Sequence, residues 1–394
     1  MWKRFQNKLR CVTCGNRLAF NCLVEREATL TREQLARGEQ LGLPSSELAS
    51  AVEQALITCE ECKTWYPVYH GLPVMLPYWT NLHDSFMNEN GEHVRRLGSN
   101  YKALHEQPAP GEDFVRKSFS KEWLDYDYDG VIWSYTVEDR RRFFIAEMGS
   151  EPPDRPCKEF LEIGCGLGLV TNFASEHFKC DGVGVDLSLA SLRATQHFRD
   201  NPFLHFVQAS VFRLPFESQS FDLVYSHGVL HHTYSTKEAF RHTAARCRPQ
   251  GRFYVWLYGP GTKSARIDRR IAYAVEMAIR PLLARSPGWA QTAALAPVSV
   301  GYAAINKVQR MLGRPLEPYN YHRALHAARD RLTPLFAHRH TPNEVKSWFE
   351  EFDFGSIRQV GPSEVPAAAA DNMLCGVGMR GELSAKRSVT CAAS

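Results

Sequence analysis

A stretch with alternating glycines, "FLEIGCGLGLVTNFASEHFKCDGVGVDLS", begins at residue 160 of the 394-residue sequence. Glycines placed after an apolar run let the backbone turn sharply and bring its amide groups close to a ligand. The spacing here is Glu162-x-Gly164-x-Gly166-x-Gly168. The dinucleotide fingerprint would place its third glycine at Leu169, and no lysine follows at the P-loop spacing. The pattern therefore indicates a ligand loop of a different kind.

Two carboxylates narrow the chemistry of that ligand. Glu162 ends the first apolar run, where a negative charge suits a cationic ligand and repels a pyrophosphate. Asp186 ends the next apolar run about twenty residues later, where a carboxylate can accept from both hydroxyls of a ribose. Adenosine joined to a positively charged group satisfies both observations.

Four cysteines form two knuckles with metal-ligand spacing. Cys11-x-x-Cys14 and Cys59-x-x-Cys62 are separated by 44 residues and supply the four thiolates that a tetrahedral structural zinc site needs. A redox role would require a helix N-terminus in a thioredoxin-like unit, which neither pair has, and buried core cysteines are the remaining alternative. Bound zinc would contribute folding free energy and need not take part in a reaction.

The glycine loop requires a sheet to position it. From about residue 156 to residue 261, short apolar runs alternate with helical stretches, which is typical of a doubly wound α/β fold with a parallel sheet. The expected strands are "KEFLEIG", "CDGVGVD", "HFVQAS", "FDLVYSHG" and "GRFYVWLYG".

Residues 160 to 259 resemble the class I S-adenosylmethionine-dependent methyltransferases, particularly the small-molecule branch that includes quinone-biosynthesis enzymes. The resemblance is carried by "LEIGCGLG", "GVDLS", "LPFESQSFDLVYSHGVLHHT" and "CRPQGRFYVW", which occur in the family's order. It implies a Rossmann-like sheet and S-adenosylmethionine as cofactor. The residues that it implies are Glu162, Gly164, Gly166 and Gly168 around the methionine part, Asp186 on the ribose and Leu187 against adenine.

One position departs from the branch. Ser210 stands after the third strand, where an aspartate usually meets the adenine amino group. The resemblance then leaves that contact to the Ser210 hydroxyl or to the backbone of Val211. Ser226 and His227 follow the fourth strand and are expected to line the methionine side.

The cysteine block resembles the small zinc-ribbon proteins that activate methyltransferases. They share split knuckles, a helical insert and a closing segment like "YPVYHGLPVML". In that family the ribbon is a separate partner, whereas here it would be fused in cis. Between the knuckles, "TREQLARGEQLGLPSSELASAVEQALI" predicts two short helices, the second capped by Ser45 or Ser46.

Methyl transfer is an in-line displacement that needs alignment, and a base when the acceptor is a hydroxyl or an amine. His231, His232 and Tyr258 follow strands four and five and are the base candidates. The alternative is that each histidine contacts the cofactor or packs in the core. The polar cluster His338, Arg339 and His340 either reaches the cleft or forms a solvated loop.

The remaining segments complete a six-part division of the chain. An aromatic segment could close over the cleft or pack in the core; its members are Trp123, Tyr126, Tyr128, Trp133 and Tyr135. Near the C-terminal end, Thr341, Pro342 and Glu344 form a helix-capping box. The expected parts are a zinc ribbon (1–80), a helical and aromatic cap (81–155), the methyltransferase core (156–261), a helical lid insertion (262–335), a helix and strands completing the core (336–381) and a disordered tail (382–394).

Composition sets weaker limits. A net charge of +4 permits an anionic partner without requiring one, and the N-terminal segment has no apolar core for export, so a cytoplasmic location is expected. The uncharged stretch 287–306 contains polar residues and proline, which favours a packed or interfacial helix over a transmembrane span. The insertion's apolar face and arginines favour a lipophilic or anionic acceptor or peripheral membrane contact, the alternative being a helix packed on the core.

Three functions are compatible with these features. The first is methyl transfer to oxygen or nitrogen of a small molecule, such as a secondary metabolite, a sugar or a lipid-linked intermediate. The second is RNA methylation with the ribbon gripping RNA, against which the ribbon lacks a dense Lys/Arg stripe and no Asn-Pro-Pro-Tyr-like motif follows strand four. The third is a non-catalytic scaffold that retains the fold, which the serine at position 210 favours.

Overall fold

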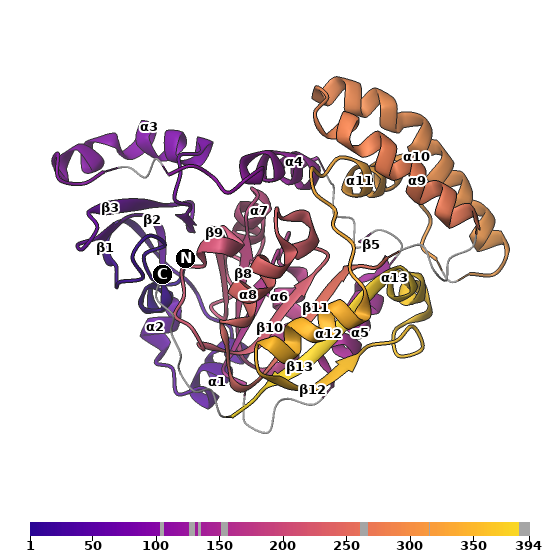
Figure 1. Ribbon diagram of the computed structural model, residues 1–394. Coiled ribbons are helices and arrows are strands. Elements are labelled where there is room, and N and C mark those ends of the chain that lie inside the picture. The colour runs from indigo at the N-terminus through magenta and orange to yellow at the C-terminus, as the bar shows by residue number, and fades with distance from the viewer. Residues whose placement is uncertain are drawn as a thin grey trace. The chain divides into compact units, whose positions relative to one another are not determined.

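The computed structural model describes residues 1–102, 106–125, 131–132, 135–150, 157–260, 267–314 and 316–385 (Figure 1). For 131–132, 267–273 and 275 it describes the backbone alone. The chain divides into two compact units. Unit 1 contains residues 1–110, 156–224 and 242–248, and unit 2 contains residues 111–155, 225–241 and 249–394. Of the expected tail, residues 386–394 lie outside the described part of the chain.

The sheet of unit 1 has the strand order β1-β2-β3-β4-β9-β8-β7-β10. The first four strands pair antiparallel, whereas β4, β9, β8 and β7 pair in parallel. The five runs expected as strands from the sequence are strands, so the α/β prediction is confirmed. The bounds are β1 (Ala19–Glu27), β2 (Ser50–Cys59), β3 (Thr64–Tyr69), β4 (Leu72–Met75), β7 (Glu159–Ile163), β8 (Asp181–Asp186), β9 (Leu204–Ala209) and β10 (Phe221–His227), whose last three residues belong to unit 2.

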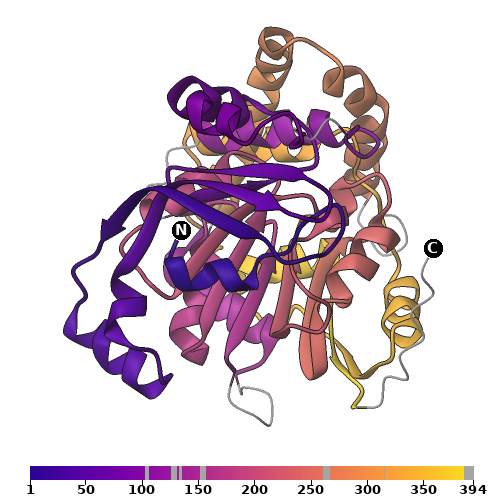
Figure 2. The same ribbon diagram turned by 90° about the vertical axis from the view of Figure 1, so that its left-hand side faces the viewer.

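The cysteine block and the glycine-loop block share this sheet. Strand β4 pairs with β9 in the register Val74 to Gln208 and Met75 to Ala209. Figures 1 and 2 show β1 to β3 as a twisted antiparallel ribbon with α3 (Asn81–Arg96) lying across it. Trp65 of β3 and Phe86 of α3 pack together beneath that helix. The ribbon is therefore a direct extension of the parallel sheet.

The segment between the knuckles differs from its prediction. Two short helices are present, α1 (Arg32–Gln40) and α2 (Ser45–Ala49), but the residue at the N-cap of α2 is Pro44 rather than Ser45 or Ser46. The sequence "SAVEQALI", expected to be helical, is β2 instead. Its residues are good helix formers, but pairing with β1 and β3 on both sides outweighs that propensity.

Charged side chains of the first helix, η1 (Lys3–Lys8), bind the parallel strands. Arg4 donates two hydrogen bonds to Asp181 at 2.6 and 2.7 Å, and Lys8 pairs with Glu159 at 2.6 Å. Between them, the ring of Phe5 stacks on His205 at 4.4 Å. The N-terminal segment is thus fastened to the starts of β7 and β8.

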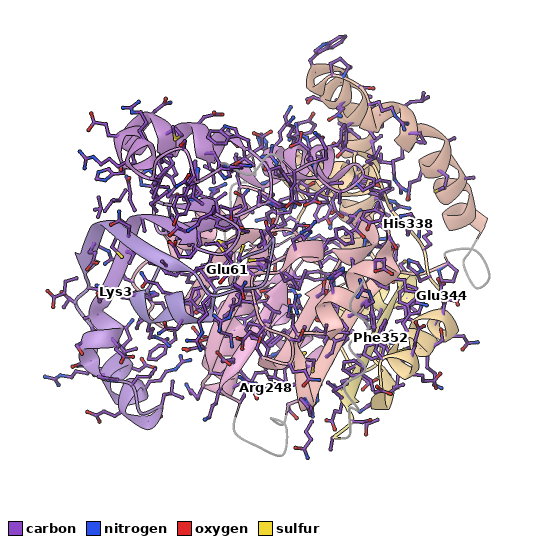
Figure 3. The ribbon with its side chains drawn as sticks, turned by 60° about the vertical axis from the view of Figure 1, so that its left-hand side comes forward. Lys3, Glu61, Arg248, His338, Glu344 and Phe352 are labelled. Carbon is purple, nitrogen blue, oxygen red and sulfur yellow. The ribbon has the colours of Figure 1, made fainter. Side chains whose placement is uncertain are left out.

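The start of β7 is also joined to the start of β10. Arg248, labelled in Figure 3, pairs with Glu159 at 2.6 Å and with Asp222 at 3.1 Å. Asp222 in turn accepts from the backbone N–H groups of Lys158 and Glu159 at 2.9 and 3.0 Å. This end of the sheet is closed by ion pairs, and the glycine loop lies at the other end of β7. The remaining helices of unit 1 are α6 (Leu169–Phe178), α7 (Ala190–His197) and η2 (Val211–Arg213).

Unit 2 combines an antiparallel sheet with helices. Its strands are ordered β11-β13-β12, and the predicted capping box of Thr341, Pro342 and Glu344 opens α12. The bounds are α4 (Glu112–Leu124), β5 (Val131–Ile132), β6 (Tyr135–Thr136), α5 (Val137–Met148), η3 (Leu230–His232), α9 (Ile267–Ala284), α10 (Gly288–Met311), α11 (Tyr321–Leu332), α12 (Pro342–Glu351), β12 (Phe354–Gln359), η4 (Ala367–Ala369), α13 (Ala370–Cys375) and β13 (Gly376–Leu383). Both α8 (Thr236–Ala244) and β11 (Cys247–Tyr258) have residues in the two units.

The long uncharged stretch of the sequence is the helix α10. Among the described residues, no helix has the length and apolarity that a membrane crossing requires. The described part of the expected tail begins inside β13, which ends at Leu383.

The Arg4 pair predicts a measurable stability effect. Arg4→Ala should lower the free energy of unfolding by about 1–3 kcal/mol, because it leaves the carboxylate of Asp181, which is 17% exposed, without its partner. Lys3→Ala is the matched control on the same helix (Figure 3), since the Lys3–Glu25 pair is exposed and such pairs contribute about 0–1 kcal/mol. Equal urea midpoints for the two variants would contradict this role for Arg4.

Candidate cofactor, metal and catalytic sites

The four predicted metal ligands converge. The sulfur atoms of Cys11, Cys14, Cys59 and Cys62 all lie within 4.8 Å of one another. The closest pairs are Cys11 with Cys62 at 3.5 Å and Cys14 with Cys59 at 3.4 Å. Four sulfurs bound tetrahedrally to zinc at 2.3 Å would be about 3.8 Å apart, so this donor set fits the ion.

The surroundings of Cys11 favour its thiolate. Burial opposes ionisation, but hydrogen bonds from the Tyr66 hydroxyl and from backbone amides lower the pKa of Cys11 to about 6. The Tyr66 oxygen lies 3.1 Å from the sulfur, and Thr64 lies 3.0 Å from the sulfur of Cys62. Hydroxyl groups from β3 thus surround the cluster, as expected around metal-bound thiolates.

The glycine loop follows β7 at the point where the strand order of the sheet reverses. Gly164, Gly166 and Gly168 all have positive φ angles, of 77°, 51° and 80°. Open α/β sheets bind ligands at the carboxyl ends of their strands where the order reverses. A side chain at Gly168 would also meet the Phe206 ring at 2.6 Å. Leu169, at the position of the dinucleotide pattern's third glycine, is instead the first residue of α6.

Hydrogen bonds from the glycine loop to the end of β8 fix the conformation of the loop. The Val185 carbonyl accepts from the amides of Gly164 and Cys165 at 2.7 and 3.0 Å. The Gly166 amide donates to Asp186 at 2.9 Å, and Ser188 donates to the same carboxylate through its backbone and its hydroxyl. Burial raises the pKa of Asp186, although these donors oppose that rise. Asp186 is half-buried and retains acceptor capacity for a ribose hydroxyl.

The side chain of Glu162 is fixed by a residue of the same unit. Its side chain is buried, and it accepts a hydrogen bond from the hydroxyl of Thr171 in α6 at 2.5 Å. The structure therefore places Glu162, the three glycines and Asp186 around one loop. Thr171 was missed in the sequence, where a threonine two residues into a helix has no distinguishing signal.

The expected adenine side lies on β9 and the loop after it. The oxygen of Ser210 accepts from the Phe212 amide at 3.2 Å and so caps η2, with Val211 as that helix's first residue. Gln208, also missed, donates to the Leu187 carbonyl at 3.0 Å, and its buried side-chain oxygen has no partner among the described residues. The signal for Gln208 in the sequence was its position as a polar side chain inside the apolar run "LHFVQAS".

The end of β10 carries a buried network in unit 2. The fully buried carboxylate of Glu147 lies 2.7 Å from His227 and accepts from Tyr225 at 2.5 Å and from Tyr254 at 2.7 Å. Burial opposes its ionisation, but His227 and Arg140 lower the pKa of Glu147. Burial also lowers the pKa of His227, against the opposing effect of the Glu147 carboxylate.

Both residues predicted for the methionine side, Ser226 and His227, lie at this end of β10. Ser226 is buried, and the His227 ring stacks on Trp256 at 4.6 Å. Glu147 was missed because it comes from α5, 80 residues before its histidine partner. A glutamate within the apolar run "RRFFIAEM" was the only signal for it.

The three base candidates lie together in unit 2. The His231 ring is 3.9 Å from the Tyr258 ring and 4.2 Å from that of His232. The Nδ1 atom of His232 lies 2.7 Å from the Phe336 carbonyl, so this nitrogen carries the proton. Its Nε2 has no hydrogen-bond partner among the residues that the structure describes. Burial lowers the pKa of His232 to about 4, which keeps the ring neutral at pH 7.

Further acidic groups face these rings. The Tyr258 hydroxyl is 3.3 Å from Asp330 of α11, whose pKa burial raises to about 6. One turn earlier on α11, His326 approaches the buried Glu122 of α4 at 3.4 Å. Burial raises the pKa of Glu122 well above its usual range and lowers that of His326 to about 3, which keeps the imidazole neutral at pH 7.

The segment from His338 to His340 is not a solvated loop. The His338 amide donates to the His231 carbonyl at 3.0 Å, and the His340 amide donates to the Tyr258 carbonyl at 2.9 Å. Arg339 lies over the Tyr258 ring at 5.4 Å. These contacts place the cluster beside the base candidates.

Arg339 belongs to a buried ion cluster. Glu276, which is 2% exposed, pairs with Arg280 of α9, with Arg331 at 2.6 Å and with Arg339 at 2.9 Å. Arg280 is buried, and the carboxylate of Glu276 one turn away neutralises it. Of the aromatic segment, Tyr135 is buried and Trp123 packs on His326, whereas Tyr126, Tyr128 and Trp133 lie outside the described residues.

The similarity of this chain to known proteins falls on the segment that contains the glycine loop and the parallel strands. Residues 161–255 match the family described as a methyltransferase domain. This part of the chain is therefore a methyltransferase domain with the class I S-adenosylmethionine-dependent fold.

Two curated relatives match over limited lengths. The tRNA U34 carboxymethyltransferase of Pseudoalteromonas atlantica is 36% identical over 95 residues, which is 23% of this chain and 29% of that protein. Sterol 24-C-methyltransferase erg6 of Schizosaccharomyces pombe is 22% identical over 209 residues, which is 51% of this chain and 53% of that protein. The chain thus spans between 29% and 53% of the length of these relatives.

A solved structure of Haemonchus contortus phosphoethanolamine N-methyltransferase 2 in complex with S-adenosyl-L-methionine is also similar. It is 11% identical and covers 93% of this chain and 69% of its own, with a TM-score of 0.41.

The thiol cluster predicts one zinc ion per chain in the purified protein. Cys59→Ser should remove that zinc, because three thiolates and a hydroxyl bind the ion far more weakly than four thiolates. Cys22→Ser changes a cysteine of β1 outside the cluster and should retain the full zinc content. Elemental analysis by mass spectrometry measures both, and zinc well below one per wild-type chain would contradict the site.

The buried imidazole predicts a pH-dependent stability. The pKa of His232 is about 4 in the folded chain and about 6.5 when unfolded, so the unfolded state binds more protons between these values. The contribution of the neutral His232 ring to the free energy of unfolding is complete above pH 6.5 and is lost as the pH falls towards 4. Relative to His232→Gln, the wild type should lose up to about 2 kcal/mol between pH 7.5 and pH 5.

Urea unfolding at the two pH values measures this difference. His322→Gln, at an exposed position of α11, is the control. A wild-type advantage over His232→Gln that stays constant across the range would contradict burial of a neutral His232.

Proposed function

We propose that this protein is an S-adenosylmethionine-dependent methyltransferase that methylates oxygen or nitrogen of a small molecule. The observation that carries the proposal is the loop of three glycines held open by Val185 and Asp186. The match of residues 161–255 to the methyltransferase domain family supports it. Secondary metabolites, sugars and lipid-linked intermediates are the acceptor classes proposed.

The cofactor residues have distinct proposed roles. Glu162 and the glycine amides would hold the methionine part, and Asp186 would accept from the ribose hydroxyls. Leu187 would contact adenine, with Val211 rather than Ser210 supplying the polar contact, because Ser210 is buried and its side chain caps η2. Ser226 and His227 remain proposed for the methionine side. The bound cofactor supplies an electrophilic methyl group, and the chain's own residues bind it, orient it and exclude water.

Among the base candidates, His232 fits the proton-accepting role best. Its Nδ1 is held by the Phe336 carbonyl, and its buried Nε2 meets no partner within the described part of the chain. A base with a pKa of about 4 accepts a proton only weakly. That strength suits an acceptor oxygen or nitrogen whose proton becomes strongly acidic as the new bond to carbon forms. Tyr258, whose pKa burial raises well above its usual range, stays protonated and would donate a hydrogen bond.

We further propose that the four cysteines bind a structural zinc ion. The ion would stabilise the ribbon, and through the pairing of β4 with β9 it would stabilise the methyltransferase sheet of unit 1. No catalytic step needs it.

Incubation with methyl-labelled S-adenosylmethionine and a fractionated cell extract tests the proposed activity. Label should enter the small-molecule fraction, and Asp186→Ala should weaken cofactor binding by about 10- to 100-fold, because the variant loses charged hydrogen bonds and the Gly166 contact. Asp200→Ala, which changes an exposed acid of the same unit, is the control. Label found only in RNA would overturn the acceptor class, and undiminished transfer by Asp186→Ala would overturn the cofactor site.

The proposed base has its own test once an acceptor fraction is known. His232→Gln should lower kcat by roughly 100-fold or more while leaving the KM for S-adenosylmethionine unchanged. His322→Gln should leave both constants unchanged. An equal fall for the two variants would show that His232 does not accept the proton.

A further inference from the structure

Large apolar side chains are exposed on the helices α9 and α10. Among the residues whose side chains the structure describes, fifteen large hydrophobic residues are exposed, and nine of them fall between residues 277 and 312. Trp289, Met311 and Leu312 are 77%, 78% and 80% exposed. The other six are Met277, Ile279, Leu282, Val300, Ile305 and Val308. Exposed apolar residues that occur singly are normal, but a concentration of this kind marks an interaction surface.

These residues do not belong to the packed side of the hairpin. Leu283 of α9 and Leu295 of α10 form a core with Ala328 and Leu332 of α11. Figure 1 shows α9 and α10 side by side, next to α11. At 3.6 residues per turn, Trp289, Val300 and Met311 fall together on the side of α10 opposite Leu295. The helix is therefore apolar on two sides, whereas a helix facing water has a polar outer face.

The charges of this segment all have one sign. Residues 277 to 316 contain no aspartate or glutamate, and their cations are Arg280, Arg285, Lys307, Arg310 and Arg314. Arg280 is neutralised inside by Glu276, and Arg314 pairs with Asp371. Within the described part of the chain, the other three cations form no ion pair. The exposed apolar face is thus accompanied by uncompensated positive charge.

We propose that the α9–α10 hairpin docks on the surface of an anionic lipid bilayer. Its apolar side chains would enter the boundary between headgroups and acyl chains, and Arg285, Lys307 and Arg310 would contact lipid phosphates. No described helix has the length and apolarity for crossing a membrane, so the hairpin lies on the bilayer. Aromatic and aliphatic residues combined with cations are typical of interfacial helices.

A second copy of this chain fits the surface less well. In a symmetric dimer the same patch faces itself, which would bring two sets of unpaired cations together without an acid between them. Anionic headgroups neutralise the same cations. The charge pattern therefore favours a bilayer over self-association, and the docking does not depend on whether the protein transfers methyl groups.

Cosedimentation of the full-length chain with lipid vesicles tests this proposal. The chain should bind vesicles of phosphatidylcholine with phosphatidylserine at least 10-fold more tightly than vesicles of phosphatidylcholine alone, and added salt should reduce that preference. Trp289→Ala should weaken binding by roughly 10-fold, because it removes a large apolar side chain from the interface. The double change Lys307→Glu and Arg310→Glu should abolish the preference for anionic lipid.

Two matched controls come from the exposed surface of unit 1. Val24→Ala removes an exposed apolar side chain, and Lys3→Glu reverses an exposed charge; both should leave vesicle binding unchanged. Calorimetry with S-adenosylmethionine checks that each variant behaves as the wild type in its cofactor domain. Absence of binding to anionic vesicles would overturn the proposal, as would a concentration-dependent dimer that Trp289→Ala disrupts.

Discussion

The hydrogen bond from the Gly166 amide to the Asp186 carboxylate is the contact on which the proposed cofactor site depends. It joins the loop after β7 to the end of β8, and the Val185 carbonyl strengthens the same connection by accepting from two loop amides. Gly164, Gly166 and Gly168 all have positive φ angles, a backbone conformation that costs free energy for any residue other than glycine. Contacts within the chain therefore fix the loop in this conformation.

The cysteine block is part of the same sheet as the glycine loop, so its contacts also stabilise the strands that position the loop. Strand β4 adds to the parallel sheet beside β9, and Arg4, Phe5 and Lys8 bind the starts of neighbouring strands. Metal bound by the four thiols would stabilise the block that supplies these contacts. Zinc binding would then contribute to the stability of the cofactor domain without contributing an atom to the reaction. A ribbon that is part of the sheet cannot dissociate as a separate partner could.

Local patterns predicted the parts of this structure that depend on local rules. The strands from β7 to β11, the glycine loop and the capping box of α12 follow from period, turn chemistry and capping, which a single sequence displays. The segment "SAVEQALI" was predicted wrongly because pairing with two strands outweighs the helix propensity of its residues. Glu147 and Glu276 could not be found, since each gathers partners from distant helices and strands. Burial of Arg280 is a consequence of one such cluster.

Calorimetric titration of the full-length chain measures directly whether the glycine loop binds S-adenosylmethionine. We expect saturable, one-to-one binding of both S-adenosylmethionine and its demethylated product, S-adenosylhomocysteine. We also expect that Asp186→Ala greatly weakens both, because the ribose contact is common to the two ligands. No measurable binding of either ligand to the wild-type chain would contradict the account and would favour a scaffold that retains the fold without the chemistry.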